Sequence, residues 1–327
     1  LLPAGEKREV AAPPNQIRDS AAVMSTCDYI IVGSGINALV AAALLGKKGK
    51  KVLVLERNDR IGGCLRTEEI TEPGFRHDVM ATTMVLFLTS PAYGALGKDL
   101  EARGLEFAHA DLPTGVLMPD GRHAILSKDR QRNIAAFEDF AAGDGRAFAR
   151  DMDRLGADAP FLFALLGGSL WSVNIFKTVL KEAWKRGPRG LAAWFGEALV
   201  SGRAHLEATY RSEEMKALFA PWVLHCGLGP ESAYSGEMLK VIGFAIELAG
   251  CPVVKGGAEN LLNAFSRLIT DNGGSIRTGA DVEAILETGN RASGVRLAGG
   301  EVLEASQGVI ASVTPTQLYD RLLKTSA

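Results

Sequence analysis

A glycine-rich hexapeptide near the start of the chain has the residue types and spacing that bind a diphosphate. Gly33-Ser34-Gly35-Ile36-Asn37-Ala38 fits the pattern G-x-G-x-x-A. The first glycine permits a tight turn, the second lets a diphosphate approach the backbone, and the small third residue lets a helix pack close to a strand. Unpaired N–H groups and the dipole at the start of the following helix favour negative charge. We therefore predict that this hexapeptide binds the diphosphate of a dinucleotide.

A carboxylate follows the glycine motif at the sequence spacing that such a site needs. Glu56 lies 23 residues after Gly33, at the end of the apolar run Val52–Leu55. An acid at this position can accept hydrogen bonds from the hydroxyls of an adenosine ribose. Glu56 is therefore our candidate for ribose binding.

These residues need a strand, a helix and a second strand to position them. The β-branched run Asp28–Val32 predicts the first strand, Ile36–Lys47 a buried helix, and Val52–Leu55 the second strand. A strand–helix–strand unit without a ligand is one alternative. A membrane span is another, because residues 30–46 carry no charge, but the glycine turn and the second strand count against it.

A second pair of glycines lies just beyond the ribose acid. Gly62 and Gly63 follow Glu56 closely, with Arg57, Arg60 and Arg66 around them. Backbone N–H groups and guanidinium groups in such a loop can bind phosphate or flavin. An ordinary surface turn is the alternative interpretation.

The sequence from this loop onward resembles a known family. ERNDRIGGCLRTEE, which begins at Glu56, and GFRHDVMATT, which ends at Thr83, are similar to the FAD-binding opening of phytoene desaturase-like flavoprotein oxidoreductases. That family shares its fold with the flavin amine oxidases and the GDP dissociation inhibitors. Cys64 stands where the family commonly has arginine, and Met80 where it commonly has glycine. Arg66 is our candidate to replace the missing arginine.

The resemblance implies an FAD cofactor and further site residues. Cys251–Asn260 resembles the P-x-G-G segment at which family members return to the flavin domain, and the backbone of Val282 is implied to contact the adenine. A merely buried strand residue is the alternative for Val282, and a solvent-facing lysine is the alternative for Lys255. The residues that the resemblance places beside the flavin or substrate are Met80, Ala81, Lys255, Gly256 and Gly257.

The fold that we predict is α/β, a Rossmann-like FAD-binding domain with a parallel sheet and a three-strand meander. Residues 27–84 and 254–327 form this domain, and residues 85–253 form an inserted, mostly helical substrate domain. We expect the meander to start near Asp281, a separate sheet strand at Gly308–Ser312, and Ser127 to cap a helix that ends near Ala141. We also expect a disordered leader at residues 1–26. Because the family's closing GD-containing segment has no counterpart, we expect a fragment that by itself can be inactive.

Composition narrows the possible partners and compartment. The chain has 327 residues, 47% hydrophobic and 23% charged, with a net charge of −2, so nothing indicates a nucleic-acid partner. Four cysteines without a C-x-x-C pair suggest a reducing compartment, and we expect the cytoplasm. Five scattered histidines lack metal-ligand spacing, so we predict no metal site.

Two apolar, aromatic stretches flank a group of basic residues in the helical region. Residues 161–176 contain Trp171, and residues 191–200 contain Trp194. Such a pattern can lie on a membrane surface. We favour ordinary helix packing and keep peripheral membrane contact as an alternative.

The predicted function is that of an FAD-dependent oxidoreductase. The flavin carries the difficult step, which agrees with a nucleotide motif and no identifiable catalytic side chain. The resemblance implies hydride removal from an apolar, isoprenoid-like small molecule, with the electron acceptor unknown. Alternatives are a non-catalytic module that binds lipids or prenylated proteins, an amine-oxidase-like flavoenzyme, and a nicotinamide-dependent dehydrogenase. The last would have a contiguous first domain.

Overall fold

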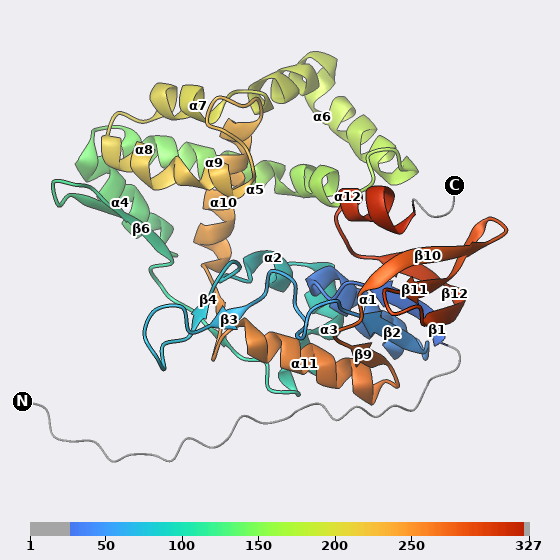
Figure 1. The fold of residues 1–327 in the computed structure, drawn as a ribbon. Helices are drawn as coiled ribbons and strands as arrows, with labels where there is room; N and C mark the ends of the chain where they lie inside the picture. The colour runs from blue at the N-terminus through green and yellow to red at the C-terminus, as the bar shows by residue number, and fades with distance from the viewer. Residues whose placement is uncertain (1–26, 324–327) are drawn as a thin grey trace, which may run out of the picture. The chain divides into compact units, whose positions relative to one another are not determined.

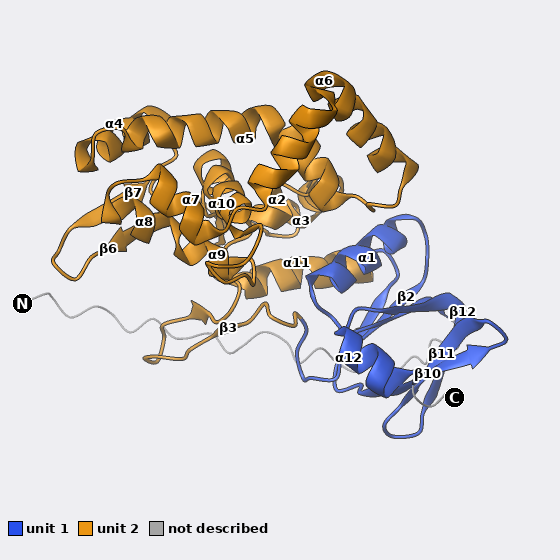
Figure 2. Cartoon of the chain, turned by 90° about the horizontal axis from the view of Figure 1, so that it is seen from above, with its two compact units in different colours: residues 1–61, 272–327 blue, residues 62–271 orange. Residues whose placement is uncertain are grey.

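The computed structural model describes residues 27–323, and the predicted leader lies outside them. The chain divides into two compact units (Figure 2). The first, here called the sheet unit, comprises Leu1–Ile61 and Asn272–Ala327. The second, here called the helical unit, comprises Gly62–Asp271.

A six-stranded sheet forms the centre of the sheet unit. Its strand order is β10-β11-β12-β1-β2-β9, in which β12, β1, β2 and β9 run parallel and β10, β11 and β12 form an antiparallel meander. The strands are β1 (Cys27–Val32), β2 (Val52–Leu55), β9 (Ser275–Arg277), β10 (Val282–Thr288), β11 (Arg291–Leu297) and β12 (Val302–Ala311). In Figure 1 the blue β1 and β2 lie beside the red β12, although these strands are far apart in sequence. The predicted α/β fold with a parallel sheet and a meander is confirmed.

The strand and helix at the predicted nucleotide motif form for local reasons. Ile30 and Ile31 of β1 are fully buried, as a strand covered on both faces requires. Helix α1 (Ile36–Lys47) buries the small residues Ala38, Ala42 and Ala43 and contacts β1 and β2. Small side chains let the helix axis approach the sheet closely. A short helix, α12 (Pro315–Gln317), and a π-helical turn (Leu318–Leu322) end the described part of this unit.

Strand β12 differs from the sequence-based expectation. A separate strand was expected at Gly308–Ser312, whereas one ten-residue strand serves both parts of the sheet. Its first half pairs with β11 in the meander, and its second half pairs with β1 in the parallel ladder. The pairing register shifts between Cys27 and Tyr29, where the two halves join.

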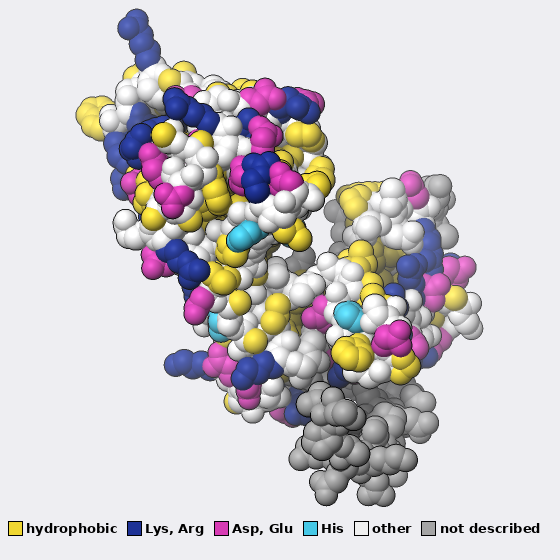
Figure 3. Space-filling view, turned by 90° about the vertical axis from the view of Figure 1, so that its left-hand side faces the viewer, with side chains coloured by type: hydrophobic (Ala, Val, Ile, Leu, Met, Phe, Trp, Pro, Cys, Tyr) yellow, Lys and Arg dark blue, Asp and Glu magenta, His cyan; other side chains and the backbone are white. Residues whose placement is uncertain are grey.

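The helical unit contains ten helices and three two-stranded ladders among the described residues. The helices are α2 (Val85–Leu88), α3 (Pro91–Glu101), α4 (Arg130–Phe140), α5 (Asp144–Gly167), α6 (Val173–Ala198), α7 (Gly202–Thr209), α8 (Glu213–Phe219), α9 (Pro221–His225), α10 (Ser235–Ala249) and α11 (Ala258–Asp271). The ladders pair β3 (Thr67–Glu68) with β4 (His77–Asp78), β5 (Phe107–Ala108) with β8 (Val253–Val254), and β6 (Thr114–Leu117) with β7 (His123–Leu126). Hydrophobic and charged side chains are interspersed on the face of the molecule drawn in Figure 3.

Local capping chemistry sets the start of α4. Ser127 was expected as the cap, but Asp129 accepts hydrogen bonds from the backbone N–H groups of Gln131 and Arg132. Ser127 is buried instead and donates to Asn133 Oδ1 at 2.8 Å. An aspartate two residues later is an equally good cap, so the expectation was wrong by two residues.

Helix α6 bends sharply in its middle. Gly187 has φ 72° and ψ 159°, and Pro188 follows it. The backbone conformation of Gly187 is not helical, and Pro188 lacks the N–H group that would continue the helical hydrogen bonds. Helix α6 therefore consists of two helical halves joined at Gly187. No described helix is both long enough and apolar enough to cross a membrane.

Candidate nucleotide-binding site

Gly33 is required by the backbone of the sheet unit. Its φ is +92°, and a Cβ there would lie 2.6 Å from the carbonyl oxygen of Ser312. The N–H of Gly33 donates to the carbonyl of Leu55 at 2.8 Å, and the N–H of Ser312 donates to the carbonyl of Val32 at 2.9 Å. Any side chain at Gly33 would therefore strain the turn and collide with the neighbouring strand end.

Gly35 lies in a different environment. Its φ of −62° and ψ of 167° suit any residue, and no described heavy atom lies within 4 Å of the position that a Cβ would take. Nothing within the sheet unit itself explains a glycine there. A group that approaches this backbone from outside would explain it.

The start of α1 offers hydrogen-bond donors at the same place. Gly35 is the N-cap residue, and no side chain caps the helix. The first N–H groups of a helix have no intrahelical acceptor, so those of Ile36, Asn37 and Ala38 suit an anion, which the helix dipole also favours. An open space beside uncapped amides fits a diphosphate.

Glu56 lies at the carboxyl end of β2 and is almost fully buried. One carboxylate oxygen accepts from the Ser34 backbone N–H at 3.2 Å and from the Ser34 hydroxyl at 2.5 Å. The other accepts from the backbone N–H of Asn58 at 2.9 Å and from its side-chain amide at 2.8 Å. Glu56 thus connects the glycine turn to the loop after β2, and ribose hydroxyls would have to replace some of these four donors.

Val282 and Arg57 complete the predicted residues of the sheet unit. Val282 begins β10 and is buried, and its carbonyl accepts from Arg321 at 3.0 Å. The segment before it is fixed to the ribose acid, because the N–H of Ala280 donates to the carbonyl of Glu56 at 2.8 Å. Arg57 is exposed and makes no hydrogen bond or ion pair with the described residues. The sheet unit therefore brings Gly33–Ala38, Glu56 and the start of β10 together.

The remaining predicted residues belong to the helical unit. Gly62 has φ +118°, and a Cβ there would lie 2.6 Å from both Leu262 and the carbonyl oxygen of Leu65. The N–H of Leu65 donates to the carbonyl of Gly62 at 3.0 Å and closes a tight turn. Gly63 is exposed with φ +59°. Packing on α11 and turn geometry explain Gly62.

The glycine pair, the β3–β4 hairpin and the return segment meet within this unit. Asp78 accepts from the Thr67 hydroxyl at 2.6 Å and from the N–H of Ala258 at 2.9 Å. Thr67 in turn accepts from the N–H of Glu259 at 3.1 Å. These two side chains cap α11, and a Cβ on Gly257 would lie 2.5 Å from Thr67. Segments distant in sequence are thus joined by hydrogen bonds.

Five further predicted residues of this unit are exposed or half-buried. The Arg66 guanidinium pairs with Glu68, and the Lys255 ammonium lies 3.0 Å from the Glu106 carboxylate. Met80 is exposed and Ala81 is half-buried. Gly256 has φ +76°, and Asn260 closes the turn by donating to the carbonyl of Lys255 at 2.7 Å.

Comparison with known proteins identifies the nucleotide-binding fold. A family model for NAD(P)-binding Rossmann-like domains matches residues 31–97. A limonene dehydrogenase chain of Castellaniella defragrans is 24% identical over 309 residues, which cover 90% of this chain and 53% of that protein. A neurosporene-forming phytoene desaturase of Rhodobacter capsulatus is 26% identical over 301 residues, which cover 90% of this chain and 54% of that protein. This chain is a homologue of the phytoene desaturases.

The resemblance to this group of proteins is thereby confirmed, and the chain spans about half the length of the curated relatives that it matches. A solved structure of an oxidoreductase from Methanosarcina mazei superposes with a TM-score of 0.54 at 18% identity, covering 86% of this chain and 58% of that one. At that identity the superposition supports the fold alone. A dinucleotide is the cofactor class that the family model supports, and both flavin and NAD(P) cofactors belong to that class.

Sequence reasoning did not identify three polar residues that hold the site segments in place. Asn58 binds Glu56, whereas Thr67 and Asp78 cap the return helix. The resemblance implied an acid at Asp78, two residues before the glycine position that Met80 takes. No motif marks Asn58, although its partner Glu56 is only two residues away. No motif marks Thr67 either, because its partner Glu259 is distant in sequence.

Proposed function

We propose that this chain binds FAD and works as an oxidoreductase on an apolar, isoprenoid-like small molecule. The observation that carries the proposal is the open space at Gly35 beside the uncapped start of α1. A diphosphate is the chemical group that needs both features. The names of the relatives, desaturases and a dehydrogenase, supply the reaction class.

The arrangement of the sheet supports a flavin over a nicotinamide cofactor. A nicotinamide-dependent dehydrogenase would complete its parallel sheet soon after Glu56. Here the neighbours of β1 and β2 are β12 and β9, which come from residues after 271. A sheet completed from the far end of the chain agrees with the discontinuous FAD-binding domain, residues 27–84 and 254–327, that we continue to propose.

Each predicted residue receives a role in this proposal. The backbone of Gly33–Ala38 holds the diphosphate, Glu56 the ribose and the backbone of Val282 the adenine. Arg57, Gly62, Gly63 and Arg66 extend the cofactor site, and Met80, Ala81, Lys255, Gly256 and Gly257 line the space for flavin and substrate. A bound flavin supplies the hydride acceptor, while the protein orients the substrate and excludes water. No catalytic side chain is proposed.

An apolar substrate of this kind dissolves in membranes rather than in water. We therefore propose that the protein acts in the cytoplasm and collects its substrate at a membrane surface.

The test is a measurement on purified protein. We expect an absorbance band near ~450 nm from bound flavin, and we expect that band to bleach when an isoprenoid polyene is added without oxygen. Failure to bind added FAD would overturn the cofactor assignment. Flavin that stays oxidised with every apolar substrate would instead favour the non-catalytic binding module.

A further inference from the structure

One surface of the helical unit exposes many large apolar side chains. It extends from the end of α5 through the connecting loop into the first half of α6. Two of its members are among the most exposed hydrophobic residues described, Trp171 at 98% and Trp184 at 92%. We call this the α5–α6 surface, and it consists of Phe163, Leu166, Leu170, Trp171, Val173, Phe176, Leu180 and Trp184.

Helical spacing aligns the part of this surface that lies on α6. Val173, Phe176, Leu180 and Trp184 are separated by three or four residues and therefore share one face of the helix. The opposite side of the helix buries Ile175 and Glu182. The first half of α6 thus has an inward face that packs against its own unit and an outward apolar face that no described residue covers.

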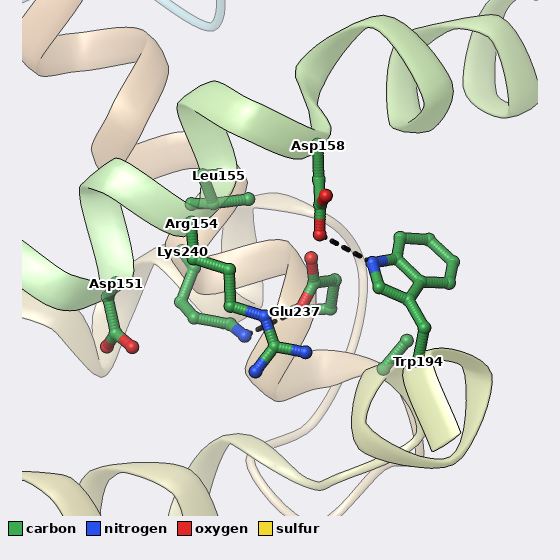
Figure 4. Close-up of a pocket in the computed structure, with 8 residues that line it drawn as sticks. Asp151, Arg154, Leu155, Asp158, Trp194, Glu237 and Lys240 are labelled. Atoms are coloured by element: carbon green, nitrogen blue, oxygen red, sulfur yellow. Dashed lines mark hydrogen bonds and ion pairs between the residues drawn. The ribbon is translucent and has the colours of Figure 1, made fainter. Parts of the chain in front are cut away.

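A buried carboxylate fixes the direction of that outward face. Asp158 of α5 pairs with Arg186 from the first half of α6. It also accepts a 2.7 Å hydrogen bond from Trp194 in the second half, which Figure 4 shows. The Trp194 ring also packs on Phe161, with centroids 5.0 Å apart. Both halves of α6 are therefore held against α5, and the apolar face stays outward.

Basic side chains flank the apolar face. Lys177 and Lys181 follow Phe176 and Leu180 directly, so they lie along one side of the apolar stripe. Lys177, Lys181 and Arg189 are exposed and form no ion pair with a described residue, and the Lys185 ammonium lies 3.8 Å from the Glu182 carboxylate. This cluster is positive on a chain whose net charge is −2.

We propose that the α5–α6 surface docks on the surface of an anionic lipid bilayer. Trp171, Phe176 and Trp184 enter the interface between headgroups and acyl chains, and the lysine ammonium groups bind lipid phosphates. Aromatic side chains beside basic ones on one helix face are the combination that this interface favours. The inference deepens the proposed function and rests on it for the apolar substrate that the bilayer dissolves.

Vesicle sedimentation tests the docking directly. Purified protein is mixed with phosphatidylcholine vesicles that contain either no anionic lipid or about 30% phosphatidylglycerol. We expect about tenfold more protein to sediment with the anionic vesicles, and most of that gain to disappear in high salt. Absence of binding, or equal binding to both kinds of vesicle, would overturn the proposal.

Two variants and a matched control locate the surface. The triple change Trp171→Ser, Phe176→Ser and Trp184→Ser should lower binding about tenfold or more, because it removes the inserted aromatic groups. Lys177→Glu with Lys181→Glu should remove the preference for anionic vesicles. The control, Leu117→Ser with Leu248→Ser, changes exposed apolar residues elsewhere in the helical unit and should bind like the unmodified chain.

Two further measurements separate the possible failures. If the triple variant sediments like the unmodified chain, or if it abolishes self-association seen by light scattering without vesicles, a bilayer is not the occupant of this surface. Flavin absorbance is recorded on the same samples. Docking without flavin would leave this inference standing and refute the proposed cofactor, whereas flavin without docking would do the reverse.

Discussion

Gly33 and Gly35 belong to one sequence motif, but the structure predicts opposite consequences when each is replaced. A valine at Gly35 meets open space, and φ −62° with ψ 167° is an ordinary conformation for it. An alanine at Gly33 meets the backbone oxygen of Ser312 at 2.6 Å and needs φ +92°. We therefore expect Gly35→Val to lose the cofactor and keep the fold, and Gly33→Ala to weaken the fold itself.

The magnitudes follow from these environments. Valine is a poorer N-cap than glycine, so Gly35→Val should lower the free energy of unfolding by about 1 kcal/mol or less. If its side chain keeps a diphosphate from two backbone amides, each worth about 1.5–3 kcal/mol, the dissociation constant for FAD should rise by about 100-fold or more. Strain and collision at Gly33→Ala should lower the free energy of unfolding by about 2 kcal/mol or more.

Two assays on the same preparations distinguish these outcomes. Urea unfolding of flavin-free protein measures the fold without the stabilisation that a bound ligand adds, and titration with FAD measures the site. Gly299→Ala is the matched control, because Gly299 also lies in the sheet unit with open space at its Cβ position. If Gly35→Val binds FAD as tightly as the control, the space beside α1 does not hold the diphosphate.

Two further changes test the ribose acid and the clamp on α6. Glu56→Ala should weaken FAD binding by about 1.5–3 kcal/mol and should also destabilise the sheet unit, because it leaves the donors of Ser34 and Asn58 without their acceptor; unchanged affinity on titration would refute the ribose role. At Asp158, burial opposes ionisation, but the hydrogen bonds from Arg186 and Trp194 outweigh it and lower the pKa below the ordinary 3.8. A lowered pKa adds stability that is complete above pH 3.8 and is lost as the pH falls below it. Unfolding free energies of the unmodified chain and of Asp158→Asn should therefore differ near pH ~7 and converge in acid, and a constant gap across that range would contradict the assignment.

Local patterns predicted the strand–helix–strand unit with its boundaries. The expected helix at Ile36–Lys47 and strand at Val52–Leu55 agree with α1 and β2, because a glycine turn, apolar runs and Gly49 specify them without help from distant residues. Two other expectations were wrong. Asp129 rather than Ser127 caps α4, and both residue types are good caps. The single strand β12 serves both the meander and the parallel ladder, where separate strands were expected.

The hydrogen-bond partners of the site segments could not be predicted from local patterns. Glu56 was identified by its spacing from Gly33, but the loop residue that binds it, Asn58, has no periodicity or motif that marks it. Asp78 reaches Ala258 across 180 residues of sequence, and Thr67 reaches Glu259 across 192. Such contacts depend on the packing of the whole unit, whereas the glycine spacing depends on one turn.

Not every glycine of a binding motif is evidence for a ligand. Gly33, Gly62 and Gly257 are each explained by the protein itself, because a Cβ would collide with Ser312, with Leu262 or with Thr67. Gly35 has no such explanation, since its conformation is ordinary and its Cβ position is open to described atoms. The case for a bound diphosphate therefore rests on Gly35 together with the uncapped helix beside it, whereas Gly62 and Gly257 are explained by packing within the protein.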